Sequence, residues 1–241
     1  MPAKKAGQSK VAVITGGGTG IGLATARLFA ESGYSVIITG RDVKRLKHAA
    51  DDITTKNSQV TAIACDVRDP ASVNKLFSAI GKQHSSIDVL INNAGVAHSL
   101  APVDKLPVET WKDVIDTNLT GMFLVTRAAL PLMRAGETIV NNLSVAAVQP
   151  FASMSAYNAS KFGALGFTHA LREDLRKRGI RVLALLPGAT DTEIWSQFWP
   201  GAPREKMISA ETVAQAVLHA VSAPANTTIE EIRIGPASGV L

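Results

Sequence analysis

The chain has 241 residues, of which 46% are hydrophobic and 5% aromatic, and its formal net charge is +5 at pH 7. This length suits one α/β domain with a sizeable core, and the basic residues are interleaved with acidic ones, as in "LREDLRKRG", so we expect no nucleic-acid partner. A membrane-spanning helix needs about 20 consecutive apolar residues, and no segment of the chain has them, so we expect no membrane partner. The single cysteine, Cys65, excludes an intrachain disulfide, which favours a reducing compartment, and we expect a cytoplasmic protein.

Seven short aliphatic or β-branched runs predict strands. They are "KVAVIT" (10–15), "SVIIT" (35–39), "VTAIA" (60–64), "DVLIN" (88–92), "TIVNNLS" (138–144), "IRVLALL" (180–186) and "IEEIRI" (229–234). Helix-patterned segments separate them, over 22–32, 42–56, 71–83, 108–133, 156–178 and 210–223. Strict alternation predicts an α/β fold, a Rossmann-like doubly wound parallel sheet of about seven strands with helices on both faces. We expect it to form a single domain over 10–241, after a flexible N-terminal tail at 1–9.

A glycine-rich loop, "TGGGTGIG" at 15–22, joins the first predicted strand to the first helix. Gly16, Gly20 and Gly22 allow the backbone to approach a pyrophosphate, and the helix N-terminus offers it unpaired N–H groups. The spacing is G-x-x-x-G-x-G, which differs from the commoner dinucleotide fingerprint. No Gly-Lys-Ser/Thr follows, which excludes a P-loop. The position between strand and helix favours a dinucleotide.

The second strand ends in "IITGRD", where a carboxylate at the tip would bind the adenosine ribose. Gly40 occupies that place and Arg41 follows it, which favours the 2′-phosphate of NADP(H) over the free ribose of NAD(H). Asp42 is a competing ribose ligand, but it lies where the next helix begins. We favour a helix N-cap for Asp42.

Seven landmarks follow one another along the chain: "TGGGTGIG" at 15–22, "CDV" at 65–67, "NNAG" at 92–95, Asn118 in "DTNLTG", Ser144 in "NNLSVAA", "YNASK" at 157–161 and "PGATDT" at 187–192. With them the chain resembles the short-chain dehydrogenase/reductase family over nearly its whole length. The resemblance implies a catalytic tetrad of Asn118, Ser144, Tyr157 and Lys161. Apart from His98, the histidines are scattered over helical segments, so we expect no metal site. The resemblance also implies a cofactor site of Gly16, Thr19, Gly20, Ile21, Gly22, Arg41, Asp66, Val67, Asn93, Ala94, Gly95, Tyr157, Lys161, Pro187, Gly188 and Thr192.

The resemblance also assigns roles to these residues. Asp66 and the backbone of Val67 should bind the adenine, "NNAG" should support the strand beneath the cofactor, and the residues of "PGATDT" should flank the nicotinamide amide. Asn118 would hold a water that connects Lys161 to solvent. Outside the family context, Asn118 reads as an ordinary helix residue and Ser144 as the end of a strand.

Tyr157 and Lys161 lie four residues apart, on one face of a predicted helix. A free phenol has a pKa near 10, and a neighbouring ammonium lowers a pKa by roughly 1 to 3 units. We therefore expect Lys161 to bring Tyr157 toward the range of a working acid/base. Ser144 would donate a hydrogen bond to the substrate carbonyl and stabilise the charge that develops there.

The substrate side is less defined by the sequence. Trp195, Phe198 and Trp199 either cap an apolar substrate or pack in the core, and His98 is either a pocket residue or a solvated loop residue. The segment between "PGATDT" and the helix near Ala210 is short, so we expect an abbreviated lid and an open pocket. The C-terminal "IGPASGVL" lacks the Asp-Gly-Gly of many relatives.

These features predict an NADP(H)-dependent oxidoreductase that interconverts a ketone and a secondary alcohol, of the 3-oxoacyl or general carbonyl reductase type. Rival interpretations are an NAD-dependent alcohol dehydrogenase and a non-catalytic nucleotide-binding regulatory protein of the same fold. A nucleotide-sugar epimerase would need a larger substrate domain. Small residues in the segments 108–133 and 156–178 predict close helix pairing in a homodimer or homotetramer.

Overall fold

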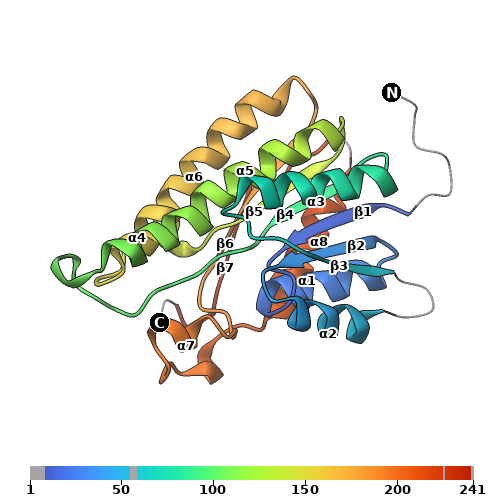
Figure 1. Ribbon diagram of the computed structural model, residues 1–241. Helices are drawn as coiled ribbons and strands as arrows, with labels where there is room; N and C mark the ends of the chain where they lie inside the picture. The colour runs from blue at the N-terminus through green and yellow to red at the C-terminus, as the bar shows by residue number, and fades with distance from the viewer. Residues whose placement is uncertain (1–8, 55–58, 225, 240–241) are drawn as a thin grey trace.

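One sheet of seven parallel strands forms the centre of the computed structural model, which describes residues 9–54, 59–224 and 226–239 (Figure 1). The strands are β1 (Val11–Thr15), β2 (Ser35–Gly40), β3 (Val60–Ala64), β4 (Val89–Asn92), β5 (Thr138–Asn142), β6 (Arg181–Pro187) and β7 (Glu231–Ile234). Their order is β3-β2-β1-β4-β5-β6-β7, and every neighbouring pair is parallel. The predicted fold class and all seven strands are confirmed. Residues 1–8 of the expected N-terminal tail lie outside the described residues.

Helices cover both faces of this sheet. They are α1 (Gly20–Glu31), α2 (Val43–Ile53), α3 (Pro70–Gln83), α4 (Val108–Ile115), α5 (Gly121–Ala129), α6 (Ser155–Arg176), α7 (Trp195–Phe198) and α8 (Ala210–Val221). Short helical turns add η1 (Val103–Lys105), η2 (Asp116–Thr120), η3 (Leu130–Leu132), η4 (Val145–Ala147) and η5 (Arg204–Lys206). Figure 1 shows α1, α2 and α8 on one side of the sheet and α3, α5 and α6 on the other, with α7 standing apart from both layers.

The apolar core lies in two layers because successive side chains of a strand point to opposite faces of the sheet. In β1, Ala12 and Ile14 pack with α1, α2 and α8, whereas Val11 and Val13 pack with α3, α5 and α6. Burial on both faces explains why the inner strands read as continuous apolar runs. The core therefore holds the carboxyl ends of the strands in fixed positions relative to one another.

The last strand, β7, lies at one edge of the sheet beside β6. Its residues alternate between exposed and half-buried, which fits the polar sequence "EIRI". Just beyond it, Gly235 lies against Gly188, since a Cβ built on Gly188 would be 3.2 Å from the Gly235 Cα. The N–H of Gly188 also donates to the carbonyl of Ile234, at 2.7 Å. The chain after β7 thus packs on the loop after β6 without an Asp-Gly-Gly.

The predicted continuous helix over 108–133 is wrong in its middle, where the structure changes helix type. The turn η2 is a π-helical segment between α4 and α5, and it contains Asn118. At its end the backbone is crowded, because a Cβ on Gly121 would lie 2.8 Å from Val67 Cγ2 and 3.2 Å from the Asp116 carbonyl oxygen. Single π-helical turns interrupt α-helices mostly at functional sites.

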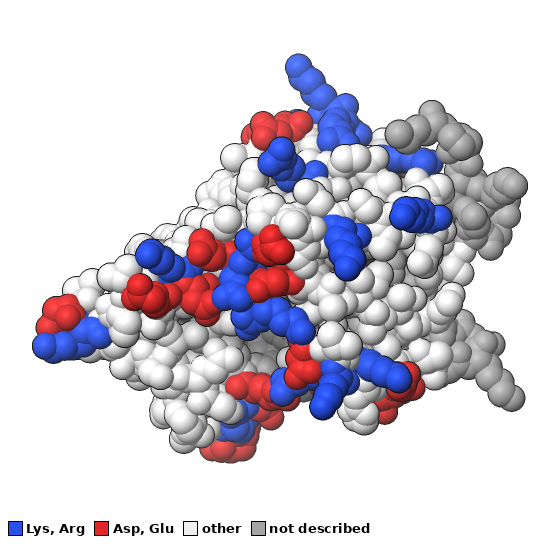
Figure 2. Space-filling model, in the orientation of Figure 1, with Lys and Arg blue, Asp and Glu red and all other residues white. Residues whose placement is uncertain are grey.

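Charged side chains of both signs are interleaved across the middle of the face shown in Figure 2. The ion pairs Arg27–Asp52 and Arg176–Glu173 are examples that lie at the surface. Pairs of this kind contribute little to stability and mark solvated helix faces. Within the described ranges, every helix is too short or too polar to span a bilayer.

Candidate active site

A cavity of about 430 Å³ opens where β1, β4, β5 and β6 end. The strand order reverses between β1 and β4, and open α/β sheets bind ligands at that point. The cavity wall includes most of the residues that the sequence predicted: Gly16, Thr19, Gly20, Ile21, Asn93, Ala94, Gly95, Ser144, Tyr157, Lys161, Pro187, Gly188 and Thr192. The remaining predicted residues, Gly22, Arg41, Asp66, Val67 and Asn118, lie outside this wall.

The glycine loop has the shape that a pyrophosphate requires. Gly16 and Gly20 have positive φ angles of 64° and 53°, a backbone conformation that residues with a side chain rarely adopt. A Cβ on Gly22 would lie 2.3 Å from the Gly16 carbonyl oxygen, so a larger residue does not fit there. Thr19, the N-cap of α1, makes no side-chain cap bond, and the first turn has no acidic residue. The N–H groups of that turn therefore remain free for an anion, which fits a dinucleotide.

Asn93 fastens this loop to the neighbouring strands. Its Nδ2 donates to the carbonyls of Thr15 and Gly16, at 2.9 and 3.1 Å, and its Oδ1 accepts from Asn142 Nδ2 at 2.8 Å. The Thr15 hydroxyl oxygen accepts from the N–H groups of Asn93 and Ala94, each at 2.9 Å. The "NNAG" segment thus connects the ends of β1, β4 and β5 beneath the cavity.

Tyr157 and Ser144 meet on the cavity wall from two different elements. Tyr157 lies in the first turn of α6, and Ser144 follows β5 as the N-cap of η4, where its hydroxyl oxygen accepts from the N–H of Ala146 at 3.1 Å. Burial raises the pKa of Tyr157, and a side-chain hydrogen bond with Ser144 partly offsets this effect. Both side chains therefore face the same cavity, where they are placed to contact a substrate oxygen.

Lys161 lies one turn further along α6 and is only 6% exposed. Burial lowers the pKa of its ammonium group to about 8. Its Nζ donates to the Asn142 carbonyl at 3.2 Å and lies 5.6 Å from the centre of the Tyr157 ring. We expected Lys161 to lower the pKa of Tyr157, but burial of the phenol outweighs any such effect and raises that pKa.

Asn118 lies behind the cavity wall, almost fully buried. Its Oδ1 accepts from the N–H of Val96 at 2.8 Å, and its Nδ2 donates to the carbonyl of Val96 at 2.9 Å and to Ser160 Oγ at 3.0 Å. The Ser160 hydroxyl in turn donates to the Tyr157 carbonyl at 2.7 Å. Ser160, which the sequence analysis did not single out, therefore connects the π-helical turn to the helix that carries Tyr157 and Lys161.

The predicted adenosine residues lie together at the ends of β2 and β3, which are neighbours in the sheet. Arg41 is exposed and makes no hydrogen bond or ion pair with any described residue. The pKa of Asp66 is lowered, mainly by a hydrogen bond from Arg68 and to a smaller extent by the charge of Arg41. The side chain of Asp42 accepts from the N–H of Arg45 at 3.0 Å, which confirms the N-cap interpretation.

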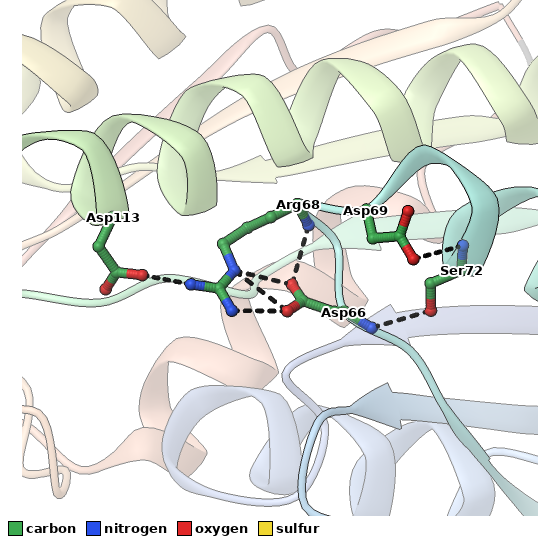
Figure 3. Close-up of polar contacts among 5 residues, drawn as sticks. All are labelled: Asp66, Arg68, Asp69, Ser72 and Asp113. Carbon is green, nitrogen blue, oxygen red and sulfur yellow. Dashed lines mark hydrogen bonds and ion pairs between the residues drawn. The ribbon is translucent and has the colours of Figure 1, made fainter. Parts of the chain in front are cut away.

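Arg68 is a partner of Asp66 that the sequence analysis did not identify (Figure 3). Its Nε and Nη2 donate to the Asp66 carboxylate at 2.9 and 2.6 Å, and its Nη1 donates to Asp113 of α4 at 2.5 Å. Both oxygens of Asp66 already accept hydrogen bonds from Arg68. An adenine bound at Asp66 would therefore share these oxygens with Arg68.

Arg45 is a second cation beside the glycine loop, one helical turn beyond Arg41. A Cβ on Gly18 would lie 3.5 Å from Arg45 Cγ, so the Arg45 stem covers the loop. Its Nη1 donates to Glu193 Oε2 at 2.8 Å. The sequence analysis found no basic residue in the loop itself.

Residues 189–208, which we call the lid, border the cavity beside the glycine loop, since a Cβ on Gly20 would lie 3.1 Å from Thr192 Cγ2. Trp195, Phe198 and Trp199 line the cavity, and no residue of α7 is buried, so these rings belong to the pocket and not to the core. Gln197 Oε1 accepts from the N–H of Ala97 at 3.0 Å, and its carbonyl accepts from the Ser99 hydroxyl at 3.3 Å. The lid is short, as expected, but it is fastened over a pocket that we expected to be open.

His98 is neither a pocket residue nor a solvated loop residue, the two alternatives that the sequence left open. It is 5% exposed, does not line the cavity, and its Nδ1 lies 2.8 Å from the Ser99 carbonyl oxygen. Among the described residues, no group of three or more His, Cys, Asp or Glu side chains is arranged to hold a metal ion.

Comparison with known proteins agrees with this architecture. Residues 10–202 match the family model of the short chain dehydrogenases. The chain is 34% identical to sulfoacetaldehyde reductase 2 of Chromohalobacter salexigens, covering 95% of this chain and 94% of the relative. It therefore belongs to the short-chain dehydrogenase/reductase family.

Two solved structures show the same fold at full length. An alcohol dehydrogenase of the archaeon Thermococcus sibiricus, complexed with 5-hydroxy-NADP, superposes with a TM-score of 0.89 at 27% identity, covering 96% of this chain and 98% of the other. A 3-ketoacyl-(acyl-carrier-protein) reductase of Brucella melitensis, complexed with NADH, superposes with a TM-score of 0.86 at 28% sequence identity. The match covers 94% of this chain and 97% of the other. The chain is thus an NAD(P)-dependent oxidoreductase of the class that acts on CH–OH groups.

Proposed function

We propose that this protein is an NADP(H)-dependent carbonyl reductase that interconverts a ketone and a secondary alcohol, with Tyr157 as the acid/base. The observation that carries the proposal is the meeting of the Tyr157 and Ser144 hydroxyls on the wall of a cavity onto which the N-terminus of α1 opens. A proton donor, a second hydrogen-bond donor and a cofactor cradle in one cavity are the parts that carbonyl reduction needs.

The protein groups divide the work as follows. A nicotinamide cofactor, when bound at the glycine loop, supplies the hydride to the carbonyl carbon. Ser144 and Tyr157 donate hydrogen bonds to the carbonyl oxygen, and Tyr157 transfers its proton as that oxygen gains charge. The raised pKa of Tyr157 keeps the phenol protonated at neutral pH, which suits the reducing direction. Lys161, largely protonated below its pKa of about 8, stabilises the phenolate that remains.

The test is a panel of ketones and alcohols assayed with NADPH and NADH by absorbance of the reduced nicotinamide. We expect ketone-dependent oxidation of NADPH. A protein that binds NADPH but turns over no carbonyl or alcohol would instead support the non-catalytic regulatory alternative.

We attribute the preference for NADP(H) to Arg41. Gly40 places no carboxylate at the tip of β2, where it would bind the ribose and repel a 2′-phosphate, and the Asp42 carboxylate is engaged as the cap of α2. Arg41 is exposed, and although its charge acts on Asp66, its guanidinium makes no hydrogen bond with any described residue and can reach such a phosphate. Arg45, by contrast, is already paired with Glu193.

Replacing Arg41 by Ala should weaken NADPH binding by about ten- to hundredfold, because a charge-assisted hydrogen bond contributes about 1.5 to 3 kcal/mol. NADH binding should stay nearly unchanged, and Lys44→Ala, which removes an exposed cation from the helix that follows Arg41, serves as control. Fluorescence titration measures both constants. A wild type that prefers NADH, or an equal loss of both cofactors, would favour the NAD-dependent alternative.

We also propose a cytoplasmic homodimer or homotetramer. Large apolar side chains are exposed on the helices that the sequence selected for pairing: Trp111 on α4, Phe123 on α5 and Phe162 on α6 are 40%, 44% and 44% exposed. Water-exposed apolar groups of this size favour burial in an interface. Light scattering should find a dimer or tetramer at micromolar concentration, and Phe162→Arg should shift it toward the monomer.

A further inference from the structure

The substrate part of the cavity is lined by apolar side chains. Beyond the glycine loop and the tetrad, its wall includes Leu100, Phe151, Met154, Trp195, Phe198 and Trp199. Leu100 and Trp199 are 52% and 42% exposed, so large apolar groups stand in water at this cavity. Exposed apolar groups around a concave site mark a surface that a ligand covers.

The aromatic part of this wall is held as a unit. The Trp195 ring lies 4.8 Å from the Phe198 ring and 6.1 Å from the Trp199 ring, between centroids. The indole N–H of Trp195 donates to the Thr190 carbonyl at 2.8 Å. This hydrogen bond turns the polar N–H of Trp195 toward the backbone. The faces of the three rings are therefore left to offer apolar surface to a ligand.

The opposite wall is fixed by the backbone of residues 151–154. Asn158 Nδ2 donates to the Phe151 carbonyl at 2.7 Å, and the N–H of Ala101 donates to the Ser153 carbonyl at 3.0 Å. Ser153 has a φ of +60°, which is unusual for a residue with a side chain and typical of functional sites. Phe151 and Met154 are therefore held in place before a substrate binds.

Apart from Lys161 in the tetrad, the described part of the cavity wall offers no cation for an acidic substituent. Its charged residues are Lys161, which is buried and donates to Asn142, and Glu193, an acid paired with Arg45. Arg204 of the lid lies outside this wall and pairs with Asp191 at 2.6 Å. An anion moved into such a site loses its hydration without gaining a partner, which is costly.

We infer that the preferred substrate of the proposed carbonyl reductase is a ketone, or the corresponding secondary alcohol, that carries a bulky, uncharged apolar group such as an aryl ring. The inference rests on the proposed function and narrows it. It sets this chain apart from its sulfoacetaldehyde-reducing relative, whose substrate is a small sulfonate. The six apolar side chains select the substrate, and the lack of a free cation excludes acids.

The test compares benzylacetone with its para-carboxylate, two ketones that differ by one charged group, and uses the methyl ester of that acid as the control for size. Assays use the full-length protein with saturating NADPH. We expect kcat/KM to be at least about tenfold higher for benzylacetone and for the ester than for the carboxylate, since an unpaired charge must be desolvated. Similar or higher kcat/KM for the carboxylate would overturn the inference and leave carbonyl reduction standing.

Two variants at exposed positions sharpen this test. Leu100→Arg places a cation on the cavity wall and should raise kcat/KM for the carboxylate, relative to benzylacetone, by about tenfold. Val103→Arg is the matched control, because Val103 is 75% exposed in the same segment and does not line the cavity. Equal effects of the two substitutions would contradict the inference. A protein that binds NADPH and reduces none of the three ketones, nor any other carbonyl, would overturn the proposed function itself.

Discussion

The tetrad and the lid are built in different ways although they face each other across one cavity. Asn118 and Lys161 of the predicted tetrad are 1% and 6% exposed, and their side chains donate to the backbone carbonyls of Val96 and Asn142. Asn118 also donates to Ser160, which is fully buried. The lid exposes Trp199 and is attached to the rest of the fold through side-chain contacts of Gln197 and Glu193. Proton transfer needs atoms fixed within fractions of an ångström, whereas substrate selection tolerates a surface that adapts.

The difference predicts which kinetic parameter each region controls. Substitutions in the tetrad should lower kcat or alter the stability of the fold, because we propose that its groups act on the reacting atoms and because Asn118 and Lys161 are buried. Substitutions in the lid should change KM and substrate preference and leave the fold intact. The following predictions test this division, beginning with the largest effect.

Replacing Tyr157 by Phe should lower kcat by about a hundredfold or more, because the change removes the proton donor and keeps the ring. Binding of NADPH, measured by fluorescence, should stay within about twofold of wild type. Turnover near the wild-type value would remove Tyr157 from the mechanism.

Lys161 should make the stability of the fold depend on pH in the alkaline range. Its pKa falls from 10.5 to about 8 on folding, so below pH 8 burial of the charged ammonium costs stability. As pH rises from 8 toward 10.5, the folded state loses its proton before the unfolded state does, and the cost is relieved. The free energy of unfolding of wild type should therefore rise relative to Lys161→Met by about 3 kcal/mol across this window.

Urea denaturation of the cofactor-free protein at several pH values measures this difference, and the comparison with Lys161→Met removes the contribution of all other groups. A difference between the two proteins that does not change with pH would show that Lys161 keeps an ordinary pKa.

Replacing Ser160 by Ala should lower the free energy of unfolding by about 1 to 2 kcal/mol, because it leaves the buried Nδ2 of Asn118 with one partner fewer. Ser155→Ala on the same helix is the matched control, since the buried hydroxyl of Ser155 has no hydrogen-bond partner in the structure. Denaturant unfolding measures both. Equal effects of the two substitutions would mean that the Asn118–Ser160 bond contributes nothing.

Replacing Gln197 by Ala should raise KM for the ketone by about two- to tenfold, because it removes one hydrogen bond between the lid and the backbone of Ala97. The stability of the fold and the affinity for NADPH should not change. Ser196→Ala, at an exposed position of the same helix that lies outside the cavity wall, should behave as wild type. A lower free energy of unfolding for Gln197→Ala would mean that the lid contributes to the stability of the fold, which contradicts the proposed division between lid and tetrad.

The same division explains how much the sequence predicted. All seven strands and the positions of Tyr157 and Ser144 were predictable, because apolar periodicity and strand-end motifs are local features. The π-helical turn at 116–120 was not, and the close packing of Gly121 against Val67 beside it joins residues far apart in the sequence. Likewise, burial of Tyr157 against the rest of the fold reversed the direction expected for its pKa.

The lid and the adenosine end show the same limit. The Arg45–Glu193 pair joins residues 148 positions apart, and the Arg68–Asp113 pair joins residues 45 apart, so no local pattern indicates either. From the sequence, the aromatic residues of the lid could line the cavity or pack in the core. Side-chain composition alone does not tell which side of a short helix faces a cavity.

Single-turnover oxidation of NADPH at saturating ketone, followed by stopped-flow absorbance, tests the central claim most directly. It compares wild type, Tyr157→Phe and Gln197→Ala under conditions where differences in KM no longer matter. The account predicts that Gln197→Ala matches wild type and that Tyr157→Phe is slower by about a hundredfold or more. Equal slowing of the two variants, or no slowing in Tyr157→Phe, would contradict the assignment of the chemistry to the tetrad and of selection to the lid.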